Sequence, residues 1–191
     1  IVMAITASLL YPEDPFRLVG KPLSKPLTNG FLLGSDSLGR DVASGIVHGA
    51  KTSLLIGFVA TLVSVFIGIF FGAFAGYFGG LIDDILMRVT EIFQTIPSFI
   101  FAILLVAIMK PSMSSIVIAI AVVSWPGVAR LVRGEFLAVK NREFVQACHT
   151  LGMSDLRIML WEILPNCLSP IIVVGSLMVA TAILIESGLA F

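Results

Sequence analysis

The sequence predicts an all-α membrane protein, a polytopic bundle of helices. Apolar residues make up 58% of the 191 residues, and the mean hydropathy is +1.05. Both values lie far above those of a soluble domain. Charged residues are also absent from four long windows, residues 52–82, 92–109, 111–129 and 163–185. Because a helix needs roughly 20 apolar residues to cross the hydrocarbon core of a bilayer, these windows predict four membrane spans.

Composition argues against several classes of function. The formal net charge is zero, whereas nucleic-acid binding requires a basic surface. Cys148 and Cys167 are too few for a disulfide or metal framework, and we interpret them as small packing residues. His48 and His149 stand alone, and no GxxxxGK[ST] loop is present to bind a nucleotide. We therefore expect no metal site, no cofactor and no enzymatic activity in this chain.

The first fifty residues predict the end of a span followed by a loop. Residues 1–10, IVMAITASLL, are too short to cross a membrane and lack the basic flank of a signal peptide. Residues 11–51 form the loop, and its first part carries four of the nine prolines. Residues 35–50 regain helical spacing, which predicts an interfacial helix capped by Ser35 or Asp36.

The core transmembrane domain is expected over residues 52–191, beginning with a span over residues 52–75. Gly68, Gly72 and Gly76 recur every four residues in this span and leave one helix face bare. In lipid, small residues allow helices to approach closely. Two interpretations stay open: a packing seam against a particular helix of this chain or of a partner, and a general small-residue face inside the bundle.

Three further spans follow. The glycines of GYFGG, residues 76–80, should end the preceding helix, and Asp83, Asp84, Arg88 and Glu91 then place charge at the water boundary. Spans are expected over residues 97–109, 115–129 and 167–189. We expect a kink at Pro97 and a loosened backbone at Trp125-Pro126-Gly127.

Residues 130–166 form the most charged segment of the chain. It holds five basic and four acidic side chains: Arg130, Arg133, Lys140, Arg142, Arg157, Glu135, Glu143, Asp155 and Glu162. A helix is expected over residues 135–149, with an interruption at Asn141, and Gly152 permits a sharp turn. Ser154 should cap a second helix that ends before Pro165, with Asp155 in its first turn. The segment therefore predicts two surface helices that can meet another protein.

The same segment carries a resemblance to a known family. Gln146-Ala147-Cys148, then Gly152, then Leu164-Pro165 resemble the "EAA…G…LP" loop of permease subunits in ATP-binding-cassette importers, where that loop docks into a cytoplasmic ATPase. LGSDSLGRDV at residues 33–42, GYFGG, and LVRGEFL at residues 131–137 resemble the dipeptide, oligopeptide and nickel branch. Importers of this branch contain two unlike permeases, and the chain resembles the second of them. The similarity covers residues 34–191.

The resemblance implies a type I importer permease fold with about six spans in the full chain, five of them at least partly present here. It implies a multi-pass protein of the inner (plasma) membrane, with residues 130–166 cytoplasmic and residues 34–50 periplasmic or extracellular. Its expected partners are membrane lipid, a second permease, an extracytoplasmic substrate-binding protein and two ATPase subunits that hold ATP and Mg²⁺. Peptides are the expected substrates, with nickel chelates, opines, glutathione and oligosaccharides left open.

The resemblance also assigns the residues that would couple to the ATPase. They are Arg142, Glu143, Gln146, Ala147, Cys148, Gly152, Ser154, Asp155 and Arg157. Gln146 stands where the family has Glu, and Cys148 stands where it has a second Ala. The loss of that carboxylate removes one ion pair, so we expect docking to depend on shape and on neighbours such as Arg142 and Glu143.

Glu186 lies in an otherwise apolar stretch, where a carboxylate is costly unless it meets water or a partner. It either lines the outer mouth of a pathway or lies solvated at the membrane boundary. It is also the one candidate for ion coupling, so a secondary transporter and a non-transporting membrane anchor remain alternative hypotheses.

Overall fold

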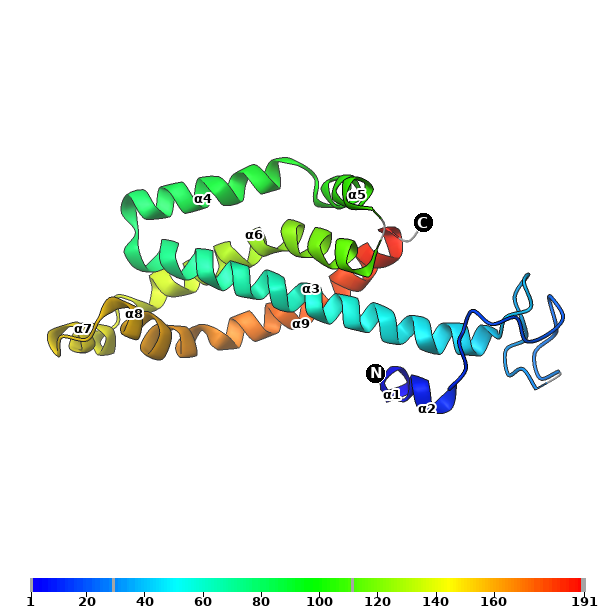
Figure 1. Ribbon diagram of the computed structural model, residues 1–191. Coiled ribbons are helices and arrows are strands. Elements are labelled where there is room, and N and C mark those ends of the chain that lie inside the picture. Colours follow the sequence, from blue (N-terminus) through cyan, green and yellow to red (C-terminus); the bar gives the residue numbers. More distant parts are fainter. Residues whose placement is uncertain (1, 29, 111, 190–191) are drawn as a thin grey trace. The chain divides into compact units, whose positions relative to one another are not determined.

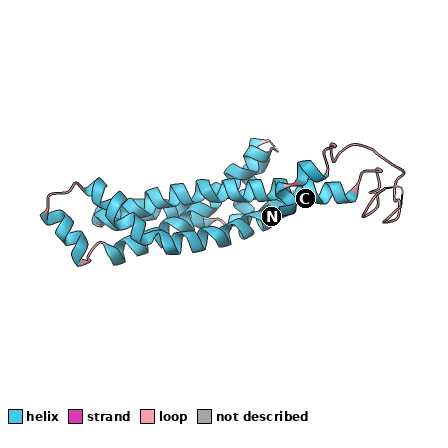
Figure 2. Cartoon of the chain, turned by 90° about the horizontal axis from the view of Figure 1, so that it is seen from below, coloured by secondary structure: helices cyan, strands magenta, loops and turns pink. Residues whose placement is uncertain are grey.

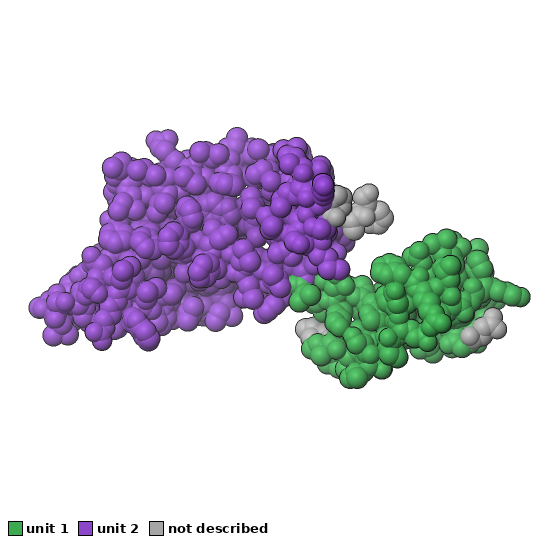
Figure 3. All heavy atoms as spheres, in the orientation of Figure 1, with its two compact units in different colours: residues 1–55 green, residues 56–191 purple. Residues whose placement is uncertain are grey.

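The computed structural model describes residues 2–28, 30–110 and 112–189, which form helices joined by short loops except for one long loop between α2 (Ala7–Leu10) and α3 (Val42–Phe78) (Figures 1 and 2). The chain divides into two compact units, residues 1–55 and residues 56–191 (Figure 3). Helix α3, Val42–Phe78, contributes residues to both units. Pro111, Ala190 and Phe191, which belong to the predicted spans and core domain, lie outside the described residues.

The first unit holds two four-residue helices, α1 (Val2–Ile5) and α2 (Ala7–Leu10), a loop and the start of α3. The Asp36 carboxylate organises this loop, because its Oδ1 accepts hydrogen bonds from the backbone N–H groups of Leu38 and Arg40 at 2.8 Å each. The helix begins later, at Val42, where the Asp41 carboxylate accepts the N–H of Ala43 at 2.9 Å. The prediction that Ser35 or Asp36 caps a helix is therefore wrong.

The predicted interfacial helix over residues 35–50 is wrong as well. Residues 35–41 are not helical, and α3 continues without a break through the region where the interfacial helix was expected to end. No proline lies in α3, so nothing in its sequence forces a turn there. Lys51, the one charge at that point, donates a hydrogen bond to the Ser8 hydroxyl at 2.8 Å.

The second unit contains the rest of α3 and all later elements. These are α4 (Gly80–Thr95), α5 (Ser98–Met109), α6 (Met113–Val139), α7 (Glu143–Thr150), α8 (Asp155–Arg157), the π-helix η1 (Ile158–Ile163) and α9 (Leu164–Leu189). Three described helical stretches are long and apolar enough to cross a membrane, namely Val42–Phe78, Met113–Val139 and Asp155–Leu189, and a bent pair of helices brings the number to four if it counts as one span. The prediction of an all-α multi-pass membrane protein is confirmed.

The helix predicted over residues 97–109 is present as α5 (Ser98–Met109), but it is too short to cross a membrane by itself. Helix α5 has 12 residues and is about 18 Å long, well short of the roughly 30 Å of a hydrocarbon core. It forms the bent pair with α4, and the two helices meet at 82°. Pro97 has an extended backbone (φ −53°, ψ 127°), so it separates two helices instead of kinking one.

Helix α6 is the most buried of the spans and is longer than predicted. It runs unbroken past Pro126 and past the expected end at Ala129, so residues 130–139 belong to the span and not to a charged loop. Val132, Phe136 and Val139 continue its buried face. Trp125 is 4% exposed, and its ring packs against Phe71 of α3 and Phe93 of α4, so packing against two other helices supports α6 at the expected weak point.

The three spaced glycines of α3 lie against α6. A Cβ on Gly72 would meet the carbonyl oxygen of Ala129, and a Cβ on Gly76 would lie 2.6 Å from the Cβ of Phe136. A Cβ on Gly68 would likewise meet the side chain of Val128. The bare face of α3 therefore allows the backbones of α3 and α6 to approach within one chain.

The predicted end of a surface helix at Pro165 is wrong, because residues 155–189 form one helical stretch. A proline ring normally clashes with the carbonyl four residues earlier, here that of Trp161. That carbonyl lies in the wider π-helix η1, in which the Leu164 N–H donates to the carbonyl of Met159. The wider turn lets the helix pass through Pro165 without ending.

Candidate functional site

Helix α7, the turn at Gly152 and helix α8 together form a segment that we call the elbow, residues 143–157. Within the second unit the elbow lies at the same end as the turn between α3 and α4 (Figure 1). Its anchor is Val145, which is fully buried and joins a cluster with Phe136, Ile158 and Met159. Cys148 lies three residues on, packs partly against the same cluster, and therefore shares this inner face of α7.

The outer face of α7 is exposed. Gln146, Ala147, His149 and Thr150 all lie in solvent-accessible positions. The Gln146 side-chain amide donates to the carbonyl of Asn141 at 3.3 Å. Helix α7 is therefore a short helix with one face bound to the core and the other presented to the surroundings.

A tight turn closes the elbow at Gly152. The N–H of Gly152 donates to the carbonyl of His149 at 3.0 Å, and the N–H of Met153 donates to the carbonyl of Cys148 at 3.1 Å. Gly152 has φ +74°, a left-handed conformation that glycine adopts without a steric penalty. The chain reverses there and enters α8.

Most charged residues in the elbow and directly before it are exposed. Arg142, at the N-cap position of α7, and Glu143, in its first turn, are exposed, and neither takes part in an ion pair among the described residues. Ser154 occupies the N-cap position of α8, but its side chain makes no capping hydrogen bond. Arg157 is exposed beside an open hollow that it lines with Trp161 and Glu162.

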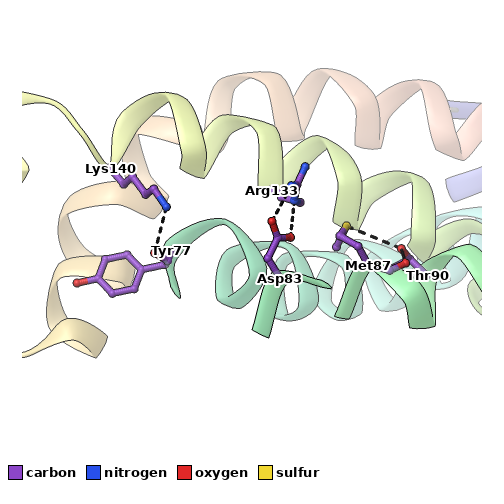
Figure 4. Close-up of polar contacts among 6 residues, drawn as sticks. All are labelled: Tyr77, Asp83, Met87, Thr90, Arg133 and Lys140. Atoms are coloured by element: carbon purple, nitrogen blue, oxygen red, sulfur yellow. Dashed lines mark hydrogen bonds and ion pairs between the residues drawn. The ribbon is translucent and has the colours of Figure 1, made fainter. Parts of the chain in front are cut away.

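Asp155 is held by a residue from a distant part of the chain. The Tyr77 hydroxyl, at the end of α3, donates to Asp155 Oδ1 at 2.7 Å, and His149 Nε2 lies 3.4 Å from the same hydroxyl. Lys140 Nζ donates to the backbone carbonyl of Tyr77 at 3.4 Å (Figure 4). The sequence does not reveal the role of Tyr77, because the partners of its hydroxyl lie more than seventy positions away and only the GYFGG motif marks it.

Sequence reasoning also missed an ion pair between α4 and α6. Arg133 Nε and Nη2 donate to the two carboxylate oxygens of Asp83 at 2.5 and 2.6 Å (Figure 4). Asp83 was expected at the water boundary, but the whole residue is only 9% exposed. Such a bidentate ion pair fixes the relative orientation of α4 and α6.

The other predicted features lie away from the elbow. Glu186 is partly buried in the last turns of α9. No group of three His, Cys, Asp or Glu side chains suited to a metal ion occurs within residues 2–28, 30–110 and 112–189.

Residues 68–191 match the family described as "Binding-protein-dependent transport system inner membrane component". The whole chain is 40% identical over 190 residues to the dipeptide transport system permease protein DppC of Bacillus subtilis and covers 59% of it. It is 41% identical over 197 residues to the di/tripeptide transport system permease protein DppC of Pseudomonas aeruginosa, covering 65%. It is 39% identical over 191 residues to the oligopeptide transport system permease protein OppC of Escherichia coli, covering 63%.

The chain thus spans about three fifths of the length of these curated relatives. Among solved structures, a chain of the MetNI methionine ABC transporter aligns with a TM-score of 0.65 and 18% identity, over 74% of this chain and 71% of that one. At this identity the likeness concerns the fold, which is that of a type I importer permease.

Proposed function

The chain belongs to the family of binding-protein-dependent transport system inner membrane components, and on that premise we propose that it is the permease subunit of an ATP-driven importer of di- and oligopeptides. The family is one of transport permeases and not of enzymes. The observation that carries the proposal is the elbow, whose outer face is exposed and whose inner face is packed on the spans. The peptide specificity is supported by the names of relatives about 40% identical over the full chain.

The proposed partners are those of such an importer. A second permease completes the pathway in the inner membrane, a substrate-binding protein delivers the peptide outside, and two cytoplasmic subunits bind ATP and Mg²⁺ and hydrolyse ATP. The sequence holds no nucleotide-binding loop of its own. The apolar window of Asp155–Leu189 is only 11% buried within the chain, which leaves surface for lipid and for the second permease.

The proposed mechanism is mechanical. The ATPases move when they bind and hydrolyse ATP, and the outer face of α7 receives that motion. Val145, Ile158 and Met159 pack in one cluster, so a displacement of α7 reaches the start of the Asp155–Leu189 stretch directly. Phe136 of α6 belongs to the same cluster, so α6 moves with it. Because packed elements move as rigid bodies, the spans would switch between two arrangements.

Uptake measurements test the proposal. In cells that carry all the other chains, deletion of this chain should abolish uptake of labelled di-, tri- and tetrapeptides, and the wild-type chain should restore it. Nickel chelates, opines and glutathione are assayed in parallel as competing substrates. Unchanged peptide uptake in the deletion strain would contradict the peptide assignment, and loss of nickel, opine or glutathione uptake instead would identify the alternative.

A further inference from the structure

We infer that Tyr77 is a positioning residue that fixes the orientation of α7 relative to α3, an inference that rests on the proposed function. Tyr77 is the penultimate residue of α3. Its hydroxyl contacts residues on both sides of the Gly152 turn, His149 before the turn and Asp155 after it. The phenol therefore bridges the two arms of the elbow and attaches both of them to a membrane span.

The chemistry of the phenol suits this role. A tyrosine hydroxyl carries one proton and can also accept. The proton goes to the Asp155 carboxylate at 2.7 Å, and a hydrogen bond to a charged acceptor is stronger than one to a neutral group. The oxygen can then accept from His149 Nε2 at 3.4 Å, and the two rings lie nearly parallel, 25° apart.

The bridge spans the glycine turn of the elbow. Glycine has more backbone freedom than any other residue, so the turn at Gly152 would otherwise let α7 swing relative to α8. A side chain that holds residues on both sides of a hinge removes that freedom. The contacts of the Tyr77 hydroxyl would thus hold α7 and α8 in a fixed relative orientation.

Tyr77 is itself well anchored. Its ring packs partly against the cluster that contains Val145, and Lys140 at the end of α6 binds its carbonyl. The preceding Gly76 lies tightly against Arg133 and Phe136 of α6. A displacement of α7 would therefore be transmitted to α3 through the Tyr77 hydroxyl as well as through the backbone.

Photo-cross-linking in the complete importer tests this role. The photoreactive amino acid p-benzoylphenylalanine replaces Ala147 on the outer face of α7, and the yield of adduct with an ATPase subunit is measured per assembled complex. Tyr77→Phe removes the hydroxyl but retains the ring and its packing. Asp155→Ala removes the acceptor, whereas Asp155→Asn keeps an oxygen that can accept. Tyr11→Phe deletes the same hydroxyl from the other tyrosine of the chain and serves as the matched control.

The inference predicts a pattern across these variants. Tyr77→Phe and Asp155→Ala should each lower the adduct yield about fivefold, the effect of one lost hydrogen bond, and the double variant should be no lower. Asp155→Asn should restore most of the yield that Asp155→Ala loses, and Tyr11→Phe should match the wild type.

Other outcomes would overturn the inference, in distinguishable ways. If the wild type forms the adduct and Tyr77→Phe forms it equally well, the role of Tyr77 is refuted and the proposed function stands. The same holds if the effects of Tyr77→Phe and Asp155→Ala multiply in the double variant, because the two residues would then act independently. If the wild type forms no adduct with any ATPase subunit, the proposed function and the inference fail together.

Discussion

Arg133 and Asp83 join α6 to α4 through two parallel hydrogen bonds, although fifty positions separate them in the sequence. The Asp83 side chain is 12% exposed and the Arg133 side chain 35%, so the pair is partly shielded from water. The ion pair lies beside the contact of α3 with α6. Arg133 takes part in that contact as well, since a Cβ at Gly76 would lie 2.8 Å from the Arg133 carbonyl oxygen. One ion pair thus connects the bent pair of helices to the central span.

Breaking this pair should loosen α4 from α6. Asp83→Asn should lower the free energy of unfolding by about 1–2 kcal/mol, less than the roughly 3–5 kcal/mol of a fully buried pair, because Arg133 retains access to solvent. Thermal unfolding of the purified protein in detergent measures the change. Asp84→Asn, at the exposed neighbouring position, is the control and should have little effect.

A double-mutant cycle with Arg133→Met isolates the interaction. We expect Asp83→Asn and Arg133→Met to be non-additive, since each removes the same two hydrogen bonds. Strictly additive effects on unfolding would show that the two side chains do not stabilise each other.

The glycine contact of α3 with α6 should tolerate no side chain at its centre. In Gly72→Ala, the new methyl group would collide with the Ala129 carbonyl oxygen, which is backbone and cannot rotate away. We expect a loss of about 1–3 kcal/mol of stability, seen as a lower unfolding temperature. Gly134→Ala adds the same methyl group to α6 where nothing lies within 4 Å, and it should be neutral or slightly stabilising. Equal unfolding temperatures for the two variants would argue against a close approach at Gly72.

The loop of residues 11–41 should depend on the charge of Asp36. The N–H groups of Arg40 and Leu38, the first most strongly, hold the pKa of the Asp36 carboxyl below its ordinary value of 3.8. A carboxyl with a lowered pKa stabilises the folded loop fully above that ordinary value and loses the contribution as the pH falls through the lower folded pKa.

Hydrogen exchange of residues 11–41, corrected for the intrinsic rate at each pH, measures this effect. Protection should stay constant from pH 8 to pH 5 and fall below about pH 4. Asp36→Asn should reduce protection already at pH 7, while Glu13→Gln, which removes only an exposed ion pair with Arg17, should not. Wild-type protection in Asp36→Asn at pH 7 would contradict the role of the carboxylate.

Hydropathy and residue spacing predict much of this fold. The charge-free windows locate α3, α6 and α9, the glycine spacing marks the face of α3 that meets α6, and Pro97 marks the point where α4 and α5 separate. These features depend on local properties of the chain, namely apolarity, side-chain volume and backbone restriction.

Two of the failures originate in contacts between distant residues, and a third in a local departure from α-helical geometry. Arg130 and Arg133 suggested that the span ends near Ala129, but Asp83 neutralises Arg133 and the buried face continues through Phe136. Pro165 suggested a helix end, but the π-helix η1 accommodates it. The contacts of the Tyr77 hydroxyl with His149 and Asp155 also join residues more than seventy positions apart. No local pattern in the sequence reveals such a contact.

The coupling role of the elbow is tested by the variant Gly152→Pro, with ATP hydrolysis and peptide uptake measured together in the assembled importer. Proline fixes φ near −65°, whereas Gly152 has φ +74°, and proline also removes the N–H that binds the His149 carbonyl. We expect a complex that assembles and hydrolyses ATP but takes up no peptide, because the elbow would no longer transmit motion. Peptide uptake at the wild-type rate per ATP hydrolysed would contradict this role.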